Sequence, residues 1–112
     1  MSLRLIANSD AAVTITVKVR NSSGVLVPYN ISAATEISWI LNTTRSETTP
    51  TLTLTKTGGD ISFTGTGSDG QYTFDLTDTQ TEDFTDTYWS RTIVTIAGKV
   101  YRSKWVEASV SL

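Results

Sequence analysis

Apolar and polar residues alternate with a period of two along most of this chain. In the segment 13–20, four apolar residues alternate with Thr, Lys and Arg, and similar alternation recurs in 37–42, 51–55, 61–63 and 72–76. A period of two points successive side chains to opposite faces of a strand. Each of these segments therefore predicts a half-buried β-strand, and Trp39 lies in phase with the apolar residues of its segment and is expected in the core.

Turn residues separate the strands. Asn21-Ser22-Ser23-Gly24 predicts a tight turn in which Gly24 takes positive φ. Pro28 cannot donate to a β-ladder and therefore marks a sheet edge or an irregular run. The segment 43–50 is polar and closes with Pro, so it predicts a surface loop. Thr77-Asp78-Thr79-Gln80 fits a capping box, and one short helical turn is expected near residues 78–84.

The last third of the chain predicts a β-hairpin around Ile96-Ala97-Gly98. A two-residue turn would require positive φ at Ala97, which its Cβ disfavours, and would set Arg91 against Lys104. A three-residue loop with Gly98 in the left-handed conformation avoids this and is the preferred register. It pairs Trp89 with Trp105. The final apolar alternation then changes phase, so a β-bulge is expected near 104–106.

Seven or so short antiparallel strands, with turn signals every 8–12 residues, are typical of an immunoglobulin-like β-sandwich. The 112 residues show no internal repeat and no interdomain linker. We therefore expect an all-β fold with a single domain spanning residues 1–112.

Composition excludes several classes of function. There is no Cys and no His, which removes disulfides, thiolate nucleophiles, imidazole bases and the commonest metal ligands. The net charge of −2 argues against a generic nucleic-acid or anionic-membrane binder. The chain is instead rich in Thr and Ser, which together make up nearly a third of it. We therefore expect that the chain is not an enzyme, needs no cofactor and binds neither nucleic acid nor a membrane.

Two motifs have structural rather than chemical interpretations. Gly65 to Gly70 matches G-x-G-x-x-G, but a strand pattern follows where a dinucleotide site needs a helix, so a hairpin loop is expected. Five carboxylates cluster around the predicted helical turn, which is a composition that a calcium site could use. Their spacing does not match an EF-hand, and caps and turns explain them, so no metal is expected. The five are Asp75, Asp78, Glu82, Asp83 and Asp86.

The candidate interaction surface consists of Trp89, Tyr101, Trp105 and Pro28. In the preferred register the two Trp residues lie on one face with Tyr101 close by. If that face is inward they belong to the core, and if it is outward they form an apolar patch that requires a partner. Both possibilities remain open, because Arg91 and Ser103 share the face. Arg102 and Lys104 are expected on the opposite face, so that charge and stacking surfaces do not converge.

The order of these elements resembles that of a known family. The front half has the alternating strand 13–19, a Ser-Gly turn, Val25-Leu26-Val27-Pro28, an Ala-Ala-Thr bend at 33–35 and the strand on Trp39. The back half has Gly70-Gln71-Tyr72-Thr73-Phe74, an Asp/Thr-rich segment and Gly98-Lys99-Val100-Tyr101. This order is similar to the immunoglobulin-like domains of tailed-phage tail and baseplate proteins, including the N-terminal domain of baseplate upper proteins. The last hairpin departs from the family, with Ala97 where Asp is usual, and the loop 43–50 is longer.

The resemblance implies a non-enzymatic structural part of a phage or prophage particle, in the tail, neck or baseplate. Its partners would be other virion proteins or copies of itself, and it would be assembled in the bacterial cytoplasm into the virion. The alternative is a carbohydrate-binding or adhesion module of a bacterial surface or secreted protein. In that case Trp89, Tyr101 and Trp105 would bind a glycan.

Overall fold

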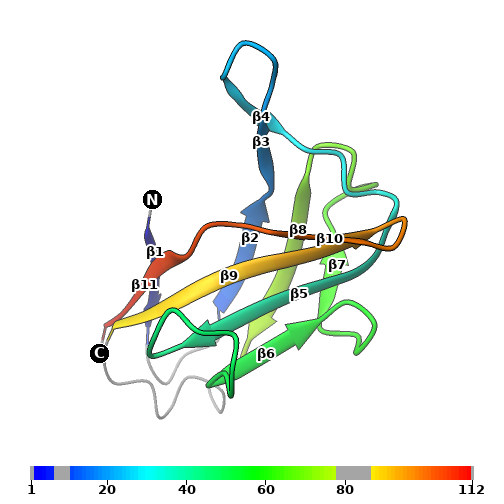
Figure 1. Cartoon of the computed structure of the whole chain (residues 1–112). Coiled ribbons are helices and arrows are strands. Elements are labelled where there is room, and N and C mark those ends of the chain that lie inside the picture. The colour runs from blue at the N-terminus through cyan, green and yellow to red at the C-terminus, as the bar shows by residue number, and fades with distance from the viewer. Residues whose placement is uncertain (1, 7–10, 78–86, 112) are drawn as a thin grey trace.

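The computed structural model describes residues 2–6, 11–77 and 87–111, and their regular elements are all β-strands (Figure 1). The all-β class and the sandwich architecture are thus confirmed. The helical turn expected near 78–84 lies outside the described residues. Within the described part of the chain, no helix is long and apolar enough to cross a membrane.

One layer is a six-stranded sheet. Its order is β1-β11-β9-β5-β6, and β10 also pairs with β9. All pairs are antiparallel except β1 with β11, which run parallel and depart from the antiparallel expectation. The strands are β1 (Ser2–Ile6), β5 (Ala34–Asn42), β6 (Leu52–Thr55), β9 (Thr87–Ile96), β10 (Lys99–Arg102) and β11 (Val106–Ser111).

The second layer is a three-stranded antiparallel sheet of order β2-β8-β7, which lies behind β5 and β9 in Figure 1. Its strands are β2 (Ala11–Thr16), β7 (Ile61–Phe63) and β8 (Gln71–Leu76). Two further strands, β3 (Lys18–Arg20) and β4 (Leu26–Pro28), form a hairpin that projects beyond the sandwich, and we call it the arm (Figure 1). The strand expected over 13–20 is therefore split at Val17, so the described strands outnumber the seven expected.

The core lies between the two sheets. Trp39 on β5 is 1% exposed and packs on Phe74 of β8, with 4.5 Å between the ring centroids. Ile37 and Leu41 are buried beside Trp39 on the same face of β5, as the alternation predicted. Asn21 to Gly24 forms the predicted turn at the tip of the arm, with Gly24 at φ 79°. The period-two pattern therefore identified the inward face of the sheets correctly.

The register expected for the β9–β10 hairpin is wrong. Lys99 pairs with Ile96 and Tyr101 with Val94, so Ala97 and Gly98 form a two-residue turn, both at positive φ (52° and 78°). A slip of one residue would turn every side chain of β10 to the other face. It would place Arg102 on the buried inner face of β9, which costs more than the roughly 1–2 kcal/mol of left-handed strain at Ala97.

The expected bulge is present, and it lies at Ser103 to Trp105. Arg102 pairs with Ile93 and Val106 pairs with Ser90, so β10 and β11 use one residue more than β9 over this interval. Ser103 bonds to β9 at the bulge, where the regular ladder is interrupted. Its Oγ accepts a hydrogen bond from the Thr92 N–H at 3.0 Å, and its own N–H donates to the Thr92 carbonyl at 2.9 Å. Because of this register Trp89 lies opposite Glu107 rather than Trp105.

Candidate functional site

Trp89 and Trp105 lie on the outer face of the six-stranded sheet, each half-buried beneath an arginine. On β9, Ser90 and Thr92 are buried on the inner face, so the alternate residues Trp89 and Arg91 point outward. The Arg45 guanidinium lies 4.3 Å from the Trp89 ring centroid, and that of Arg91 lies 4.4 Å from Trp105. Such cation–π contacts cover the rings. The pair is therefore neither part of the core between the sheets nor a bare platform.

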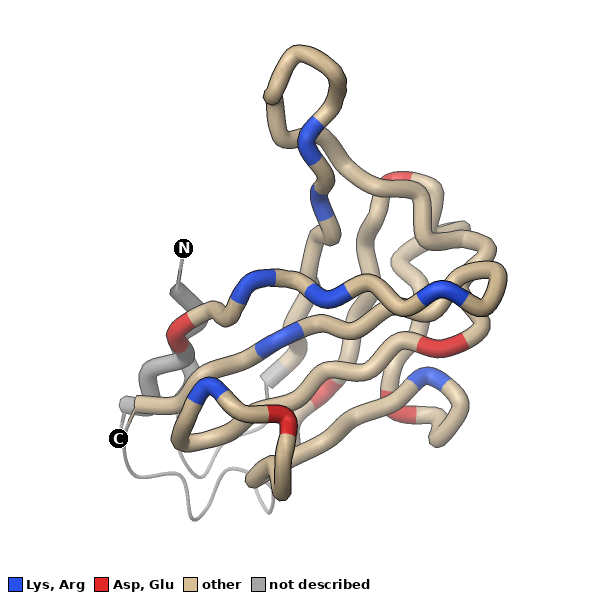
Figure 2. Tube along the Cα trace, viewed as in Figure 1, with Lys and Arg blue, Asp and Glu red and all other residues tan. Residues whose placement is uncertain are grey.

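The loop 43–50 folds back over this outer face and carries Glu47 to the arginines (Figure 2). Glu47 Oε2 accepts hydrogen bonds from Arg91 Nη1 at 2.7 Å and from Arg102 Nε at 3.0 Å. The Arg91 hydrogen bond is the main reason that the pKa of Glu47 is lowered from its ordinary value, with Arg102 adding to the effect. Charge and stacking surfaces thus converge here, against the expectation from alternation, because the bulge turns Trp105 to the same side as Arg102.

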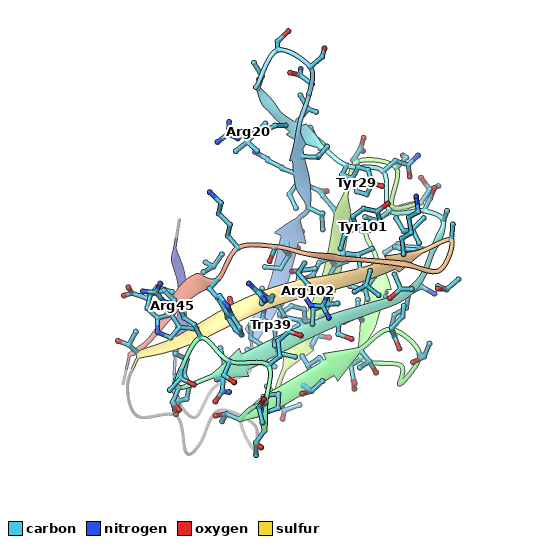
Figure 3. All side chains as sticks on the ribbon, in the orientation of Figure 1. Arg20, Tyr29, Trp39, Arg45, Tyr101 and Arg102 are labelled. Atoms are coloured by element: carbon cyan, nitrogen blue, oxygen red, sulfur yellow. The ribbon has the colours of Figure 1, made fainter. Side chains whose placement is uncertain are left out.

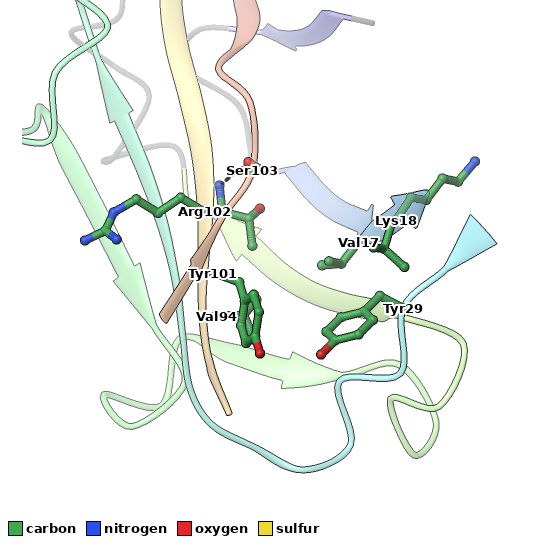
Figure 4. A pocket seen from close by; sticks show the side chains of 9 residues that line it. Val17, Lys18, Tyr29, Val94, Tyr101, Arg102 and Ser103 are labelled. Carbon is green, nitrogen blue, oxygen red and sulfur yellow. Dashed lines mark hydrogen bonds between the residues drawn. The ribbon is translucent and has the colours of Figure 1, made fainter. Parts of the chain in front are cut away.

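Tyr101 lies on the other face of the sheet, away from Trp89 and Trp105. It pairs with the inward-facing Val94 and approaches Tyr29 at the base of the arm, with 6.0 Å between the ring centroids (Figure 4). The expected cluster of Trp89, Tyr101 and Trp105 on one face is therefore wrong. Pro28 is exposed at the end of β4, next to Tyr29 at the base of the arm.

An apolar groove opens beside Tyr29 and Tyr101, between the β2–β3 segment and the β10–β11 segment. It consists of two adjoining cavities of about 250 and 190 Å³, which share Val17, Thr92 and Ser103 in their linings. Val94 lies in the floor of the larger cavity and Trp39 in that of the smaller. The groove thus gives access to the edge of the core between the two sheets.

Both strands that border the groove are edge strands among the described residues. β2 pairs with β8 alone, and β10 pairs with β9 alone. An edge strand presents unpaired backbone N–H and C=O groups, which can pair with another chain. The groove therefore combines apolar lining with free hydrogen-bonding edges.

The arm and β10, which meet at the Tyr29–Tyr101 pair (Figure 3), both carry exposed apolar side chains. On the arm, Val19, Val25 and Leu26 are 44%, 55% and 52% exposed, and on β10 Val100 and Tyr101 are also exposed. The tip of the arm is well ordered by hydrogen bonds, since Asn21 Oδ1 accepts from the N–H groups of Ser23 and Val25 at 2.9 and 3.1 Å. The arm thus presents apolar residues on a defined hairpin.

The glycine-rich loop supports the base of the arm. Gly65 to Gly70 is a hairpin connection followed by strand β8, so the interpretation of the G-x-G-x-x-G match as a turn is confirmed. Gly70 is buried at φ 76°, and its carbonyl accepts from the Val17 N–H at 2.7 Å. A Cβ at Gly70 would lie 2.6 Å from the Val17 carbonyl oxygen and 2.7 Å from that of Tyr29. Only glycine permits this approach.

Among the described residues, no three acidic side chains come close enough together to hold a metal ion. Four of the five carboxylates that suggested calcium lie in 78–86, outside the described part of the chain, so the structure describes only Asp75 of that set.

Sequence reasoning missed Tyr29 and Val17 as parts of a surface site. A signal for Tyr29 exists in the sequence, because Val25, Val27 and Tyr29 alternate with Leu26 and Pro28. The alternation places Val17 inside one continuous strand over 13–20. Val17 lies at the kink between the sandwich and the arm because it contacts Gly70, which is distant in sequence. Alternation within one segment contains no information about such a contact.

No protein-family model matches this chain, and no curated protein matches it in sequence. Among solved structures, the chain is similar to part of an endo-beta-1,4-mannanase from Thermotoga petrophila, with 15% identity and a TM-score of 0.55. The similarity covers 98% of this chain and 18% of the mannanase chain. At this identity the comparison supports the fold alone.

Proposed function

We propose that this chain is a non-enzymatic structural component of a phage or prophage particle, in its tail, neck or baseplate, and acts by packing against other protein subunits. The observation that carries the packing role is the arm, a projecting hairpin that exposes Val19 and Val25 on one face and Leu26 on the other, with Val19 lining an apolar groove. Apolar residues exposed together on a protein surface mark interaction sites. The virion setting rests on the order of sequence elements shared with tail and baseplate domains.

The chemistry of the surface fits a packing role better than catalysis. The chain has no His or Cys, and on the outer face Glu47, Arg91 and Arg102 form an ion-paired cluster. Weak contacts suffice in a particle, because many copies of one contact act together. Residence in the virion, after assembly in the bacterial cytoplasm, is part of the proposal.

The test is proteomics of purified particles from the source strain. We expect the chain in intact particles, and Leu26→Ser on the arm to reduce its incorporation severalfold. Thr53→Ser, an exposed change on the far-edge strand β6, is the matched control and should be incorporated normally. Particles that lack the chain while the soluble cell fraction contains it would refute the virion assignment.

A carbohydrate-binding or adhesion module is the second candidate. It is favoured by the Tyr29–Tyr101 pair at the mouth of the groove. Titration of tryptophan fluorescence with a glycan panel, including β-1,4-linked mannan oligosaccharides, distinguishes the two. A saturable shift that Trp105→Ala or Tyr101→Ala abolishes would favour this candidate.

A further inference from the structure

The six-stranded sheet has a vacant strand position beside β10. On the far side of β11, the parallel strand β1 pairs from Ser2 with Glu107 to Ile6 with Ser111. No described strand continues that row past the bulge, so β10 has β9 on one side and no described strand on the other. The edge from Lys99 to Arg102 can therefore accept one more strand.

The groove lies directly beside this vacant position. In a strand added to β10, every second side chain would point to the inner face of the sheet, as Tyr101 does. These side chains would enter the larger cavity, whose lining includes Val17, Tyr29, Val94 and Tyr101 (Figure 4). Strand addition of this kind takes affinity from main-chain hydrogen bonds and specificity from pockets for alternate side chains.

The positive charge along the β10 edge favours an acidic partner strand over a second copy of this chain. Lys99, Arg102 and Lys104 lie within six residues that contain no acid, and Lys18 lines the opposite wall of the groove. In the described part of the chain, Lys18, Lys99 and Lys104 form no ion pair. A second copy of this chain that paired through the same edge would double the positive charge along one ladder, and like charges that face each other across strands are destabilising.

We propose that the β10 edge and the groove bind an extended segment of another protein, in which apolar residues alternate with acidic or hydroxyl residues, as an added β-strand. The proposal rests on the proposed function in one respect only, that the partner is a protein. The inward residues of the segment fill the groove beside Tyr101, whose face Lys99 shares, and its outward acidic residues pass Arg102 toward Lys104.

The probe is a synthetic, acetylated and amidated peptide of about nine residues, the length of a long strand, in which valine alternates with glutamate and threonine. A matched peptide has lysine in place of each glutamate. Titration of the isotope-labelled full chain is followed by amide NMR shifts. We expect saturable shifts at 99–104 and 17–19 with the acidic peptide only, and slower hydrogen exchange of the β10 amides that point away from β9.

Charge variants make the test specific. Lys104→Glu should weaken binding of the acidic peptide roughly tenfold, because a close charge pair across an interface is worth about this much. Lys56→Glu, the same change next to β6 at the other edge of the sheet, should leave binding unchanged. Tyr101→Ser should weaken both the affinity and the slowing of exchange.

Three outcomes would overturn the proposal. The first is equal binding of the acidic and the lysine peptide, and the second is the absence of a saturable amide shift at millimolar acidic peptide. The third is a change of the amide shifts at 99–104 with protein concentration when no peptide is present, which would assign the edge to a second copy. The result is separable from the virion assignment. If particles contain the chain but the groove binds neither peptide, this inference alone is refuted. If the groove binds the acidic peptide but particles lack the chain, the virion assignment alone is refuted.

Discussion

Tyr72 on β8 and Thr92 on β9 are joined by a buried hydrogen bond that ties one sheet of the sandwich to the other, with 2.5 Å between Tyr72 Oη and Thr92 Oγ1. Burial strongly raises the pKa of the Tyr72 hydroxyl, against the smaller opposing effect of the Thr92 hydrogen bond, so it stays neutral. Thr92 also lines both cavities of the groove. The bond therefore fixes the spacing between the sheets where the groove reaches the core.

Removal of either hydroxyl should destabilise the fold. We expect Tyr72→Phe to lower the free energy of unfolding by about 1 kcal/mol, because the Thr92 hydroxyl that it leaves unpaired borders the groove. Thr92→Val should cost about 1–3 kcal/mol, because the Tyr72 side chain that it leaves unpaired is 0% exposed. The double variant should lose less than the sum of the two. Urea denaturation measures this cycle, and strictly additive losses would contradict the pairing.

Gly70→Ala should be among the most damaging single substitutions at a glycine. Positive φ and a Cβ within 2.7 Å of two carbonyl oxygens act together, and we expect a loss of roughly 2–4 kcal/mol. Gly65→Ala, in the same loop at φ 64° with open space around it, is the control and should lose only about 1 kcal/mol. Thermal unfolding reports both values. Equal losses would show that backbone strain alone, and not the contact with the arm, accounts for the effect.

Ala97→Asn should stabilise the β9–β10 hairpin. Asn tolerates left-handed φ better than Ala and is favoured before Gly in two-residue turns, so a gain of about 0.5–1 kcal/mol is expected. Ala33→Asn, at an exposed position without positive φ, should give no gain. A loss of stability in Ala97→Asn would speak against the two-residue turn and for the three-residue loop.

Glu47→Gln should cost up to about 1 kcal/mol at neutral pH, since a half-exposed ion-pair cluster contributes modestly. The pKa of Glu47 is lowered in the folded state, so its contribution is present above the ordinary value of 4.5 and is lost as the pH falls through the folded value. The difference in unfolding free energy between wild type and variant should therefore shrink below about pH 4.5. Asp75→Asn, exposed on β8, serves as the control. A difference that stays constant down to pH 2 would contradict the role of Glu47.

The alternation of residues predicted the faces of the strands but not the surface site. Val13 is buried and Val19 is 44% exposed, although both occupy the same phase, because the strand leaves the sandwich at Val17. Periodicity reports the face of a residue and not what lies across from it. Likewise, the face on which Tyr101 lies depends on the register of the β9–β10 hairpin, which can differ by one residue. The strain at Ala97 disfavours one register and the burial of Arg102 disfavours the other, and the burial of Arg102 costs more.

The parallel pairing of β1 with β11 has a mechanical consequence. Ser2 pairs with Glu107 at one end of the ladder, and Ile6 pairs with Ser111 at the other. A pulling force that enters at Ser2 and leaves at Ser111 acts along the two strands in opposite directions, so it loads the hydrogen bonds of the ladder in shear. Several rungs must then break together instead of opening one after another. The ladder acts as a clamp that transmits tension along the chain without first unfolding the sandwich.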